Sequence, residues 1–158
     1  MDADGDRRGA AGAGADAEAE TIPIAPHAGA LARTLANQGR PAEALPWCDR
    51  WIESDKLDSS AHYLRAVILL ELADREQARR SFQRVVYLQP DFVLAHYALG
   101  TLARDLGERE QAERHFANAR HLLARLPPAE LLPESDSLTA GRLAETMTAA
   151  AALEARPQ

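Results

Sequence analysis

The side chains of this sequence that could support catalysis or metal binding are one cysteine, five histidines and a pair of adjacent serines. His115 and His121 are six residues apart and would point to different faces of a helix, so they do not form a metal site. Cys48 could be a reactive thiol, but its type also suits a small core side chain, which we favour. Ser59 and Ser60 have no base at helical spacing. We therefore predict no enzymatic activity, no metal site and no cofactor.

The first 24 residues are rich in Ala, Gly and acidic side chains. Residues 1–22 contain six acids and two bases, so they account for −4 of the total net charge of −6. A stretch with so little to bury is predicted to be a disordered acidic tail. Its glycines at 9, 12 and 14 lack the preceding strand and the spacing that a phosphate-binding loop requires.

Charge and hydropathy exclude two classes of partner for the rest of the chain. It carries a net charge of −2 without a basic stripe, so nucleic acid is not expected to bind. No apolar run approaches the ~18 residues of a membrane helix, and the acidic N-terminus is not a secretory signal. A single cysteine is compatible with a reducing compartment. These features predict a cytoplasmic protein without membrane insertion.

A period of 34 residues organises the chain from residue 25 to residue 126. Small side chains or Phe recur at three matching positions of the copies 25–58, 59–92 and 93–126, namely Ala32, Ala44 and Cys48, then Ala66, Ala78 and Phe82, then Gly100, Ala112 and Phe116. Each copy is predicted to form two helices, over 27–38 and 42–54, 60–72 and 76–88, and 92–106 and 109–125. The small residues let the two helices of each hairpin cross closely.

Several single residues refine this pattern. His62 and His96 occupy equivalent places and are interpreted as half-buried structural residues. Asp91 is the expected N-cap of its helix, and Gly107 is the expected C-terminal stop. Pro46 is expected to delay or bend the start of the helix over 42–54, because it lacks a backbone N–H.

A loop with three prolines, residues 127–138, leads to a final helix predicted over 139–155, with Thr139 as N-cap. Leu143 and Met147 lie on the apolar stripe of this helix. One interpretation is a helix that caps the last repeat, since terminal repeats need a polar outer face. The alternative is a segment of the chain's own that lies in the binding groove as a ligand.

The 34-residue period, with Ala followed four positions later by Phe, resembles the tetratricopeptide repeat family. This resemblance implies an all-α fold, a right-handed superhelical stack of three helix–turn–helix repeats with a C-terminal capping helix. The first helices of the repeats would line a concave groove that binds a peptide or protein. By this resemblance the groove residues are Arg33, Asn37, Tyr63, Val67, Leu70, Glu71, Leu94, Tyr97, Thr101, Arg104 and Asp105.

Within the groove, Tyr63 and Tyr97 are expected to contact the partner, and Arg104 is expected to pair with an anion or carboxylate. The alternative for both tyrosines is packing between neighbouring helices. The places where related chaperone adaptors hold a terminal carboxylate are Gly29, Leu64, Leu94 and Ala98 here, and only Arg33 could help. We therefore do not expect a clamp of that kind, since apolar residues cannot pair a desolvated carboxylate.

A narrower resemblance concerns Tyr87–Arg104, Arg114–Pro128 and Leu132–Glu145, which look like the repeat region downstream of the catalytic domain in some CheR-class chemotaxis protein-glutamate methyltransferases. This resemblance implies a chemosensory methylation pathway, with a methyltransferase or a chemoreceptor segment as partner. The catalytic domain of such an enzyme has no counterpart in the acidic tail. The alternative is a detached or remnant accessory domain that acts only with a separate catalytic chain.

Overall fold

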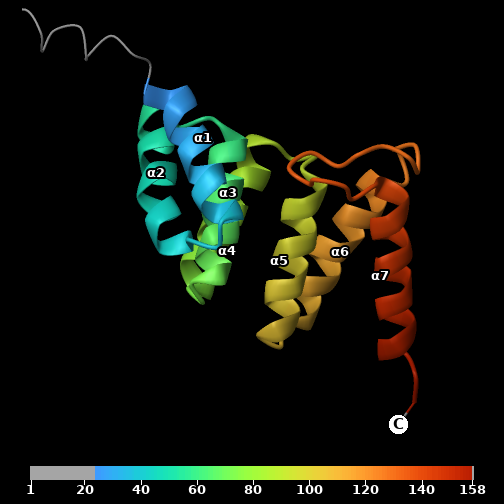
Figure 1. Cartoon of the computed structure of the whole chain (residues 1–158). Coiled ribbons are helices and arrows are strands. Elements are labelled where there is room, and N and C mark those ends of the chain that lie inside the picture. Colours follow the sequence, from blue (N-terminus) through green and yellow to red (C-terminus); the bar gives the residue numbers. More distant parts are fainter. Residues whose placement is uncertain (1–23, 158) are drawn as a thin grey trace, which may run out of the picture.

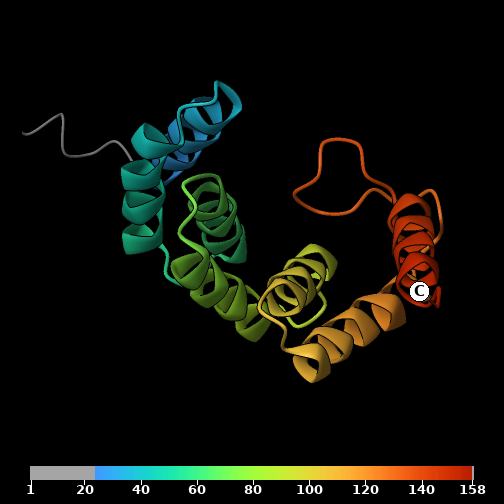
Figure 2. The ribbon, with the colours of Figure 1, turned by 90° about the horizontal axis from the view of Figure 1, so that it is seen from below.

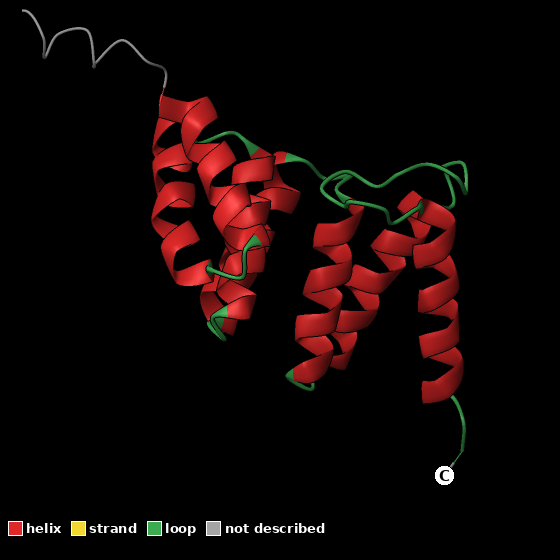
Figure 3. Ribbon diagram, viewed as in Figure 1, coloured by secondary structure: helices red, strands yellow, loops and turns green. Residues whose placement is uncertain are grey.

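The computed structural model describes residues 24–157, and it is built from helices and loops (Figure 3). Its helices are α1 (Ile24–Asn37), α2 (Pro41–Ser54), α3 (Ser59–Glu71), α4 (Arg75–Leu88), α5 (Val93–Asp105), α6 (Arg109–Leu123) and α7 (Ala140–Glu154). The described residues form no strand, and their only isolated β-bridge joins Leu131 to Thr139. The predicted tail and its glycines lie outside the described residues, apart from Ile24, where α1 begins.

The helices form three hairpins, α1–α2, α3–α4 and α5–α6, followed by α7 (Figure 1). Seen from below, the hairpins follow a curve, with α1, α3 and α5 on its inner side and α2, α4 and α6 on its outer side (Figure 2). The all-α prediction and its paired helices are confirmed. The stack curves because each hairpin packs on the next, α2 on α3 and α4 on α5, with a rotation at each step.

The turns inside the hairpins use one backbone conformation three times. Gly39, Ala73 and Gly107 have φ angles of 72°, 62° and 76°. In the second hairpin the amide of Ala73 donates to the carbonyl of Leu70 over 3.0 Å, and the amide of Asp74 donates to that of Leu69 over 2.9 Å. This is the Schellman arrangement, which satisfies the last carbonyls of a helix and favours glycine at the left-handed residue. Ala73 therefore holds a conformation that strains its Cβ.

Close helix crossing explains the small residues of the period. Ala66 and Ala78 are fully buried. A Cβ added to Gly100 would lie 2.6 Å from Cε1 of Phe116, so the aromatic ring of α6 rests directly on the α5 backbone. The predicted reason for these residues, a short distance between the paired helices, is confirmed.

The predicted N-cap of α5 and the predicted delay of α2 are both wrong. The N-cap of α5 is Phe92, which makes no side-chain cap bond, and Asp91 is exposed. The ring of Phe92 is 3% exposed and lies 4.9 Å from that of Tyr63, so burial of Phe92 sets where the helix begins. Pro46 does not delay α2, which begins at Pro41. Pro46 is exposed, so water can reach the carbonyl that its missing N–H leaves free.

The C-terminal part folds back over the stack. Residues 127–139 form a loop that crosses toward α1 and α3 on the inner side of the curve (Figure 2). α7 then runs beside the third hairpin and buries Ala140, Leu143 and Met147 in the main core. The helix therefore packs as an end piece of the stack, while the loop before it reaches the concave side.

Candidate functional site

The residues predicted to face the groove belong to α1, α3 and α5, the helices on the inner side of the curve (Figure 2). Leu94 is buried, at 8% exposure, and belongs to the main core. Tyr63, Val67, Tyr97, Thr101 and Arg33 are partly buried, and Asn37, Leu70, Glu71, Arg104 and Asp105 are exposed. The surface therefore has half-buried residues at its centre and charged residues at its edge, which is the pattern of a binding surface with an apolar centre and a polar rim.

The two groove tyrosines have different surroundings. Tyr63 packs against Phe82 and Phe92, with ring centroids 5.7 and 4.9 Å apart. Burial, together with the charge of Glu134, raises the pKa of Tyr63 to about 12. The packing alternative thus describes Tyr63, whose ring supports the core below the groove. Tyr97 lies 5.9 Å from the ring of Phe116 and also lines a cleft that faces α7.

Arg33 on α1 holds a carboxylate from the far end of the chain. Its Nη1 and Nη2 atoms donate to the two carboxylate oxygens of Glu134 over 2.6 and 3.0 Å. The guanidinium also lies over the ring of Trp51, 5.4 Å from its centroid. Such a paired geometry fixes both the position and the orientation of the carboxylate.

Each member of the Arg33–Glu134 pair favours the charged form of the other. The Glu134 side chain is only 14% exposed, whereas that of Arg33 is 42% exposed. Burial opposes ionisation of Glu134, but hydrogen bonds from Arg33 and Ser60 and the charge of Arg33 lower its pKa below the ordinary value. The hydrogen bond to Glu134 likewise raises the pKa of Arg33. Ser60 lies in the first turn of α3, where the helix dipole also favours an anion.

A small hairpin within the C-terminal loop, residues 131–139 and called the loop hairpin below, places Glu134 beside Arg33. The amide of Leu132 donates to the carbonyl of Leu138 over 3.0 Å, and the hydroxyl of Ser135 donates to the carbonyl of Leu132 over 2.7 Å. Leu132 is 2% exposed and joins the main core. Glu134 has a φ angle of 65°, in the left-handed region that a glutamate rarely adopts. The backbone is thus bent at the residue that reaches Arg33.

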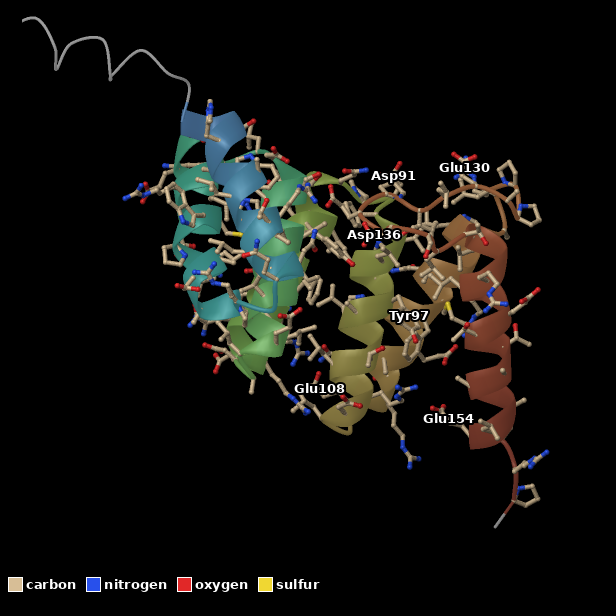
Figure 4. All side chains as sticks on the ribbon, in the orientation of Figure 1. Asp91, Tyr97, Glu108, Glu130, Asp136 and Glu154 are labelled. Atoms are coloured by element: carbon tan, nitrogen blue, oxygen red, sulfur yellow. The ribbon has the colours of Figure 1, made fainter. Side chains whose placement is uncertain are left out.

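The second groove arginine is also paired with a C-terminal acid. Arg104 donates to Glu154 of α7 over 3.2 Å, and its guanidinium lies 5.6 Å from the centroid of Phe116. Figure 4 shows Glu154 on the side of α7 that faces the α5–α6 hairpin, with Tyr97 deeper between the same elements. The cleft at this point is lined by apolar and aromatic side chains, including Tyr97, Phe116 and Met147, and by four charged residues, Arg104, Glu113, Arg120 and Glu154. The expected carboxylate partner of Arg104 is therefore supplied by the chain itself.

Three of the residues considered for chemistry, His62, His96 and Cys48, have structural contacts. His62 and His96 each hydrogen-bond, through Nε2, to the carbonyl six residues earlier, over 3.0 and 2.7 Å. Cys48 is fully buried, and burial raises the pKa of its thiol to about 12. No group of three or more His, Cys, Asp or Glu in residues 24–157 could hold a metal ion. None of the helices described there is long and apolar enough to span a membrane.

Sequence reasoning missed Glu134 and Glu154, which bind the groove arginines. Glu154 lies in the final helix, for which a ligand-like segment is one of two interpretations, whereas Glu134 lies in the loop before it. The open question had concerned the final helix, whereas the element that enters the concave side is the hairpin before it. The only local signal is the series Pro133, Glu134, Ser135 and Asp136, which is typical of a turn.

Comparison with known proteins supports this description of the fold. Residues 59–92 match the family model described as tetratricopeptide repeat. Among solved structures, the TPR2B domain of yeast Sti1 in complex with an Hsp70 peptide has a TM-score of 0.69 at 16% identity, covering 84% of this chain and 99% of that one. The second repeat domain of Spaghetti (RPAP3), bound to the HSP90 peptide SRMEEVD, has a TM-score of 0.60 at 21% identity, covering 66% and 98%.

MamA has a TM-score of 0.62 at 17% identity over 64% of this chain. The match spans 59% of the MamA chain, less than two thirds of its length. No curated protein matches the sequence at a significant level. The family match within the second hairpin and the structural matches define the chain as having the tetratricopeptide repeat fold.

Proposed function

We propose that this protein is a non-catalytic interaction module that binds a segment of another protein on its concave side. The observation that carries the proposal is the loop hairpin, residues 131–139, which already lies on the concave side. The concave side holds a polypeptide segment through one buried apolar side chain, Leu132, and one paired carboxylate, Glu134. Apolar anchors and oriented polar contacts are the features that protein-binding sites use. The peptide complexes of the Sti1 and RPAP3 domains, which share the fold, add support.

The partner that we propose belongs to a chemosensory methylation pathway in the cytoplasm. This part rests on the resemblance of residues 87–104, 114–128 and 132–145 to the repeat region of CheR-class methyltransferases. The stretch 132–145 supports it most, because it lies outside the 34-residue period and so does not follow from the repeat pattern. A methyltransferase or a cytoplasmic chemoreceptor segment is the expected partner.

The test measures binding of the purified protein to a chemotaxis methyltransferase and to cytoplasmic receptor segments. Tyr97→Ala removes a ring that lines the cleft beside α7, and Tyr87→Ala is the matched control on α4, where the ring is 75% exposed. We expect Tyr97→Ala to weaken binding about tenfold or more and Tyr87→Ala to leave it unchanged, with helicity equal in both. Absence of binding to both candidates, or equal effects of the two substitutions, would contradict the proposal.

The second candidate is an accessory domain that acts only beside a separate methyltransferase chain, and the same resemblance favours it. It predicts that adding this protein in trans changes the rate of receptor methylation by such a chain. The first candidate predicts binding without a direct change in the rate of the isolated enzyme. Methylation assays with and without the protein, on a soluble receptor fragment, separate the two.

A further inference from the structure

Arg33 and its neighbours form a binding site that suits one acidic side chain. Two features converge on the carboxylate of Glu134: the paired Nη atoms of Arg33 and the Ser60 side chain. These groups come from two different hairpins, so they form a site on the inner side of the curve. Asp58, which caps α3, adds one nearby negative charge, so the site suits a single acid better than an acidic run.

The residue that fills this site belongs to a loop hairpin whose outer side chains, Pro133, Asp136 and Ser137, are exposed. Leu132 and Leu138 anchor this segment on the main core, and the Arg33–Glu134 pair ties it to α1. Glu134 itself holds a positive φ angle. A left-handed backbone is unfavourable for a glutamate, so it persists here because the surrounding contacts, including the ion pair with Arg33, hold it in place. A segment without that strain would bind the same groups more favourably.

We propose that the site at Arg33 recognises, on a partner protein, an acidic residue that follows an apolar residue by two positions, and that Leu132–Glu134 is an internal ligand closing this site in the free protein. The proposal rests on the proposed function and names its partner chemistry and its regulation. The external segment must place its apolar side chain where Leu132 lies and its carboxylate on Arg33. Because the internal ligand is tethered, it lowers the apparent affinity of the external one by the fraction of molecules in which the site is open.

The probe is a fluorescein-labelled peptide with the sequence of residues 129–138, capped at both ends, measured by fluorescence anisotropy against the full chain. A second peptide carries Glu134→Gln. The protein variants are the unchanged chain, Glu134→Gln, and Glu134→Gln combined with Arg33→Met. The matched control combines Glu134→Gln with Arg84→Met, because Arg84 is an exposed arginine on the outer helix α4.

We expect the acidic peptide to bind the Glu134→Gln protein about tenfold more tightly than the unchanged chain, because the weakened internal ligand leaves the site open more often. The Gln peptide should bind that protein about tenfold more weakly than the acidic peptide. Adding Arg33→Met should remove the difference between the peptides, and adding Arg84→Met should not. Equal binding of the acidic peptide to the unchanged and Glu134→Gln proteins, or no binding to either, would overturn the proposal.

Hydrogen exchange shows whether each variant still folds. In Glu134→Gln the amides of Leu132 and Ala140, bonded to Leu138 and Glu130 over 3.0 and 2.8 Å, should exchange faster, while α5 amides keep their protection. Loss of protection throughout the repeats, and not in the loop hairpin alone, would mean that the loop hairpin serves only to stabilise the fold. If the protein binds its partner through Tyr97 while acidic and neutral peptides bind equally, this inference fails and the proposed function stands.

Discussion

The interaction free energy between Arg33 and Glu134 can be measured with a double-mutant cycle. Glu134→Gln keeps the shape of the side chain and removes its charge. Hydrogen bonds to charged groups contribute about 1.5–3 kcal/mol, but exposed ion pairs contribute only about 0.2–1 kcal/mol. Glu134 is 14% exposed and Arg33 is 42% exposed, so the pair lies between these limits. We expect a loss of about 1–2 kcal/mol, which lowers the melting temperature by about 3–6 °C.

The assay is thermal unfolding followed by circular dichroism for the unchanged chain, Glu134→Gln, Arg33→Met and the double variant. Arg33→Met leaves Glu134 without its partner, so its own effect should equal or exceed that of Glu134→Gln. The double variant should lose less than the sum of the single variants, with a coupling energy of about 1–2 kcal/mol. The control is Glu76→Gln in the Glu76–Arg80 pair of α4, which is 76% and 72% exposed. It should change stability by less than about 0.5 kcal/mol.

The dependence on pH gives a second test of the same reasoning. The pKa of Glu134 in the folded protein lies below its unfolded value of 4.5, because hydrogen bonds from Arg33 and Ser60 outweigh the effect of burial. Its stabilising contribution is therefore complete above pH 4.5 and is lost as the pH falls through the folded pKa. The gap between the unchanged chain and Glu134→Gln should narrow as the pH falls below 4.5. A gap that stays constant throughout acid titration below pH 4.5, or a coupling energy below about 0.3 kcal/mol, would refute the argument.

Three further predictions concern the stability of the hairpins. Ala73→Gly should stabilise the protein by about 0.5–1 kcal/mol in urea unfolding, because the φ angle of 62° at Ala73 is left-handed and favours glycine. Gly107→Ala should destabilise the protein by a similar amount, because Gly107 has the same kind of backbone, with a φ angle of 76°. Gly100→Ala should destabilise by about 1 kcal/mol in the same assay despite better helix propensity, because the added Cβ would lie 2.6 Å from the Phe116 ring; a gain in stability would contradict this. Burial, followed by neighbouring positive charges, lowers the pKa of His115 in the folded state. The free energy of unfolding should therefore fall as the pH drops below 6.5, the unfolded pKa of this histidine. His115→Gln should remove its share of this pH dependence, measured by urea unfolding from pH 7 to pH 5.

The sequence by itself determined the hairpins and their order. Ala66 and Ala78, at small positions of the period, are buried where α3 crosses α4, and Gly107 ends α5 with a left-handed turn. These features are readable because each depends on residues within a single 34-residue unit, where helix geometry fixes which side chains meet. The start of α5 was less readable, since burial of Phe92 against Tyr63, a contact between hairpins, outweighed the capping preference of Asp91.

Only the tertiary structure decided what the groove contains. Arg33 and Glu134 are 101 residues apart, and Arg104 and Glu154 are 50 residues apart. Their pairing depends on the rotation from one hairpin to the next, summed along the stack, and on a left-handed backbone at a glutamate that no local preference favours. A repeat pattern specifies each step of the curve, but small differences between steps accumulate. For this reason Arg33 and Arg104 could be predicted as groove residues from the resemblance to a repeat family, while the structure was needed to show that Glu134 and Glu154 of the same chain lie against them.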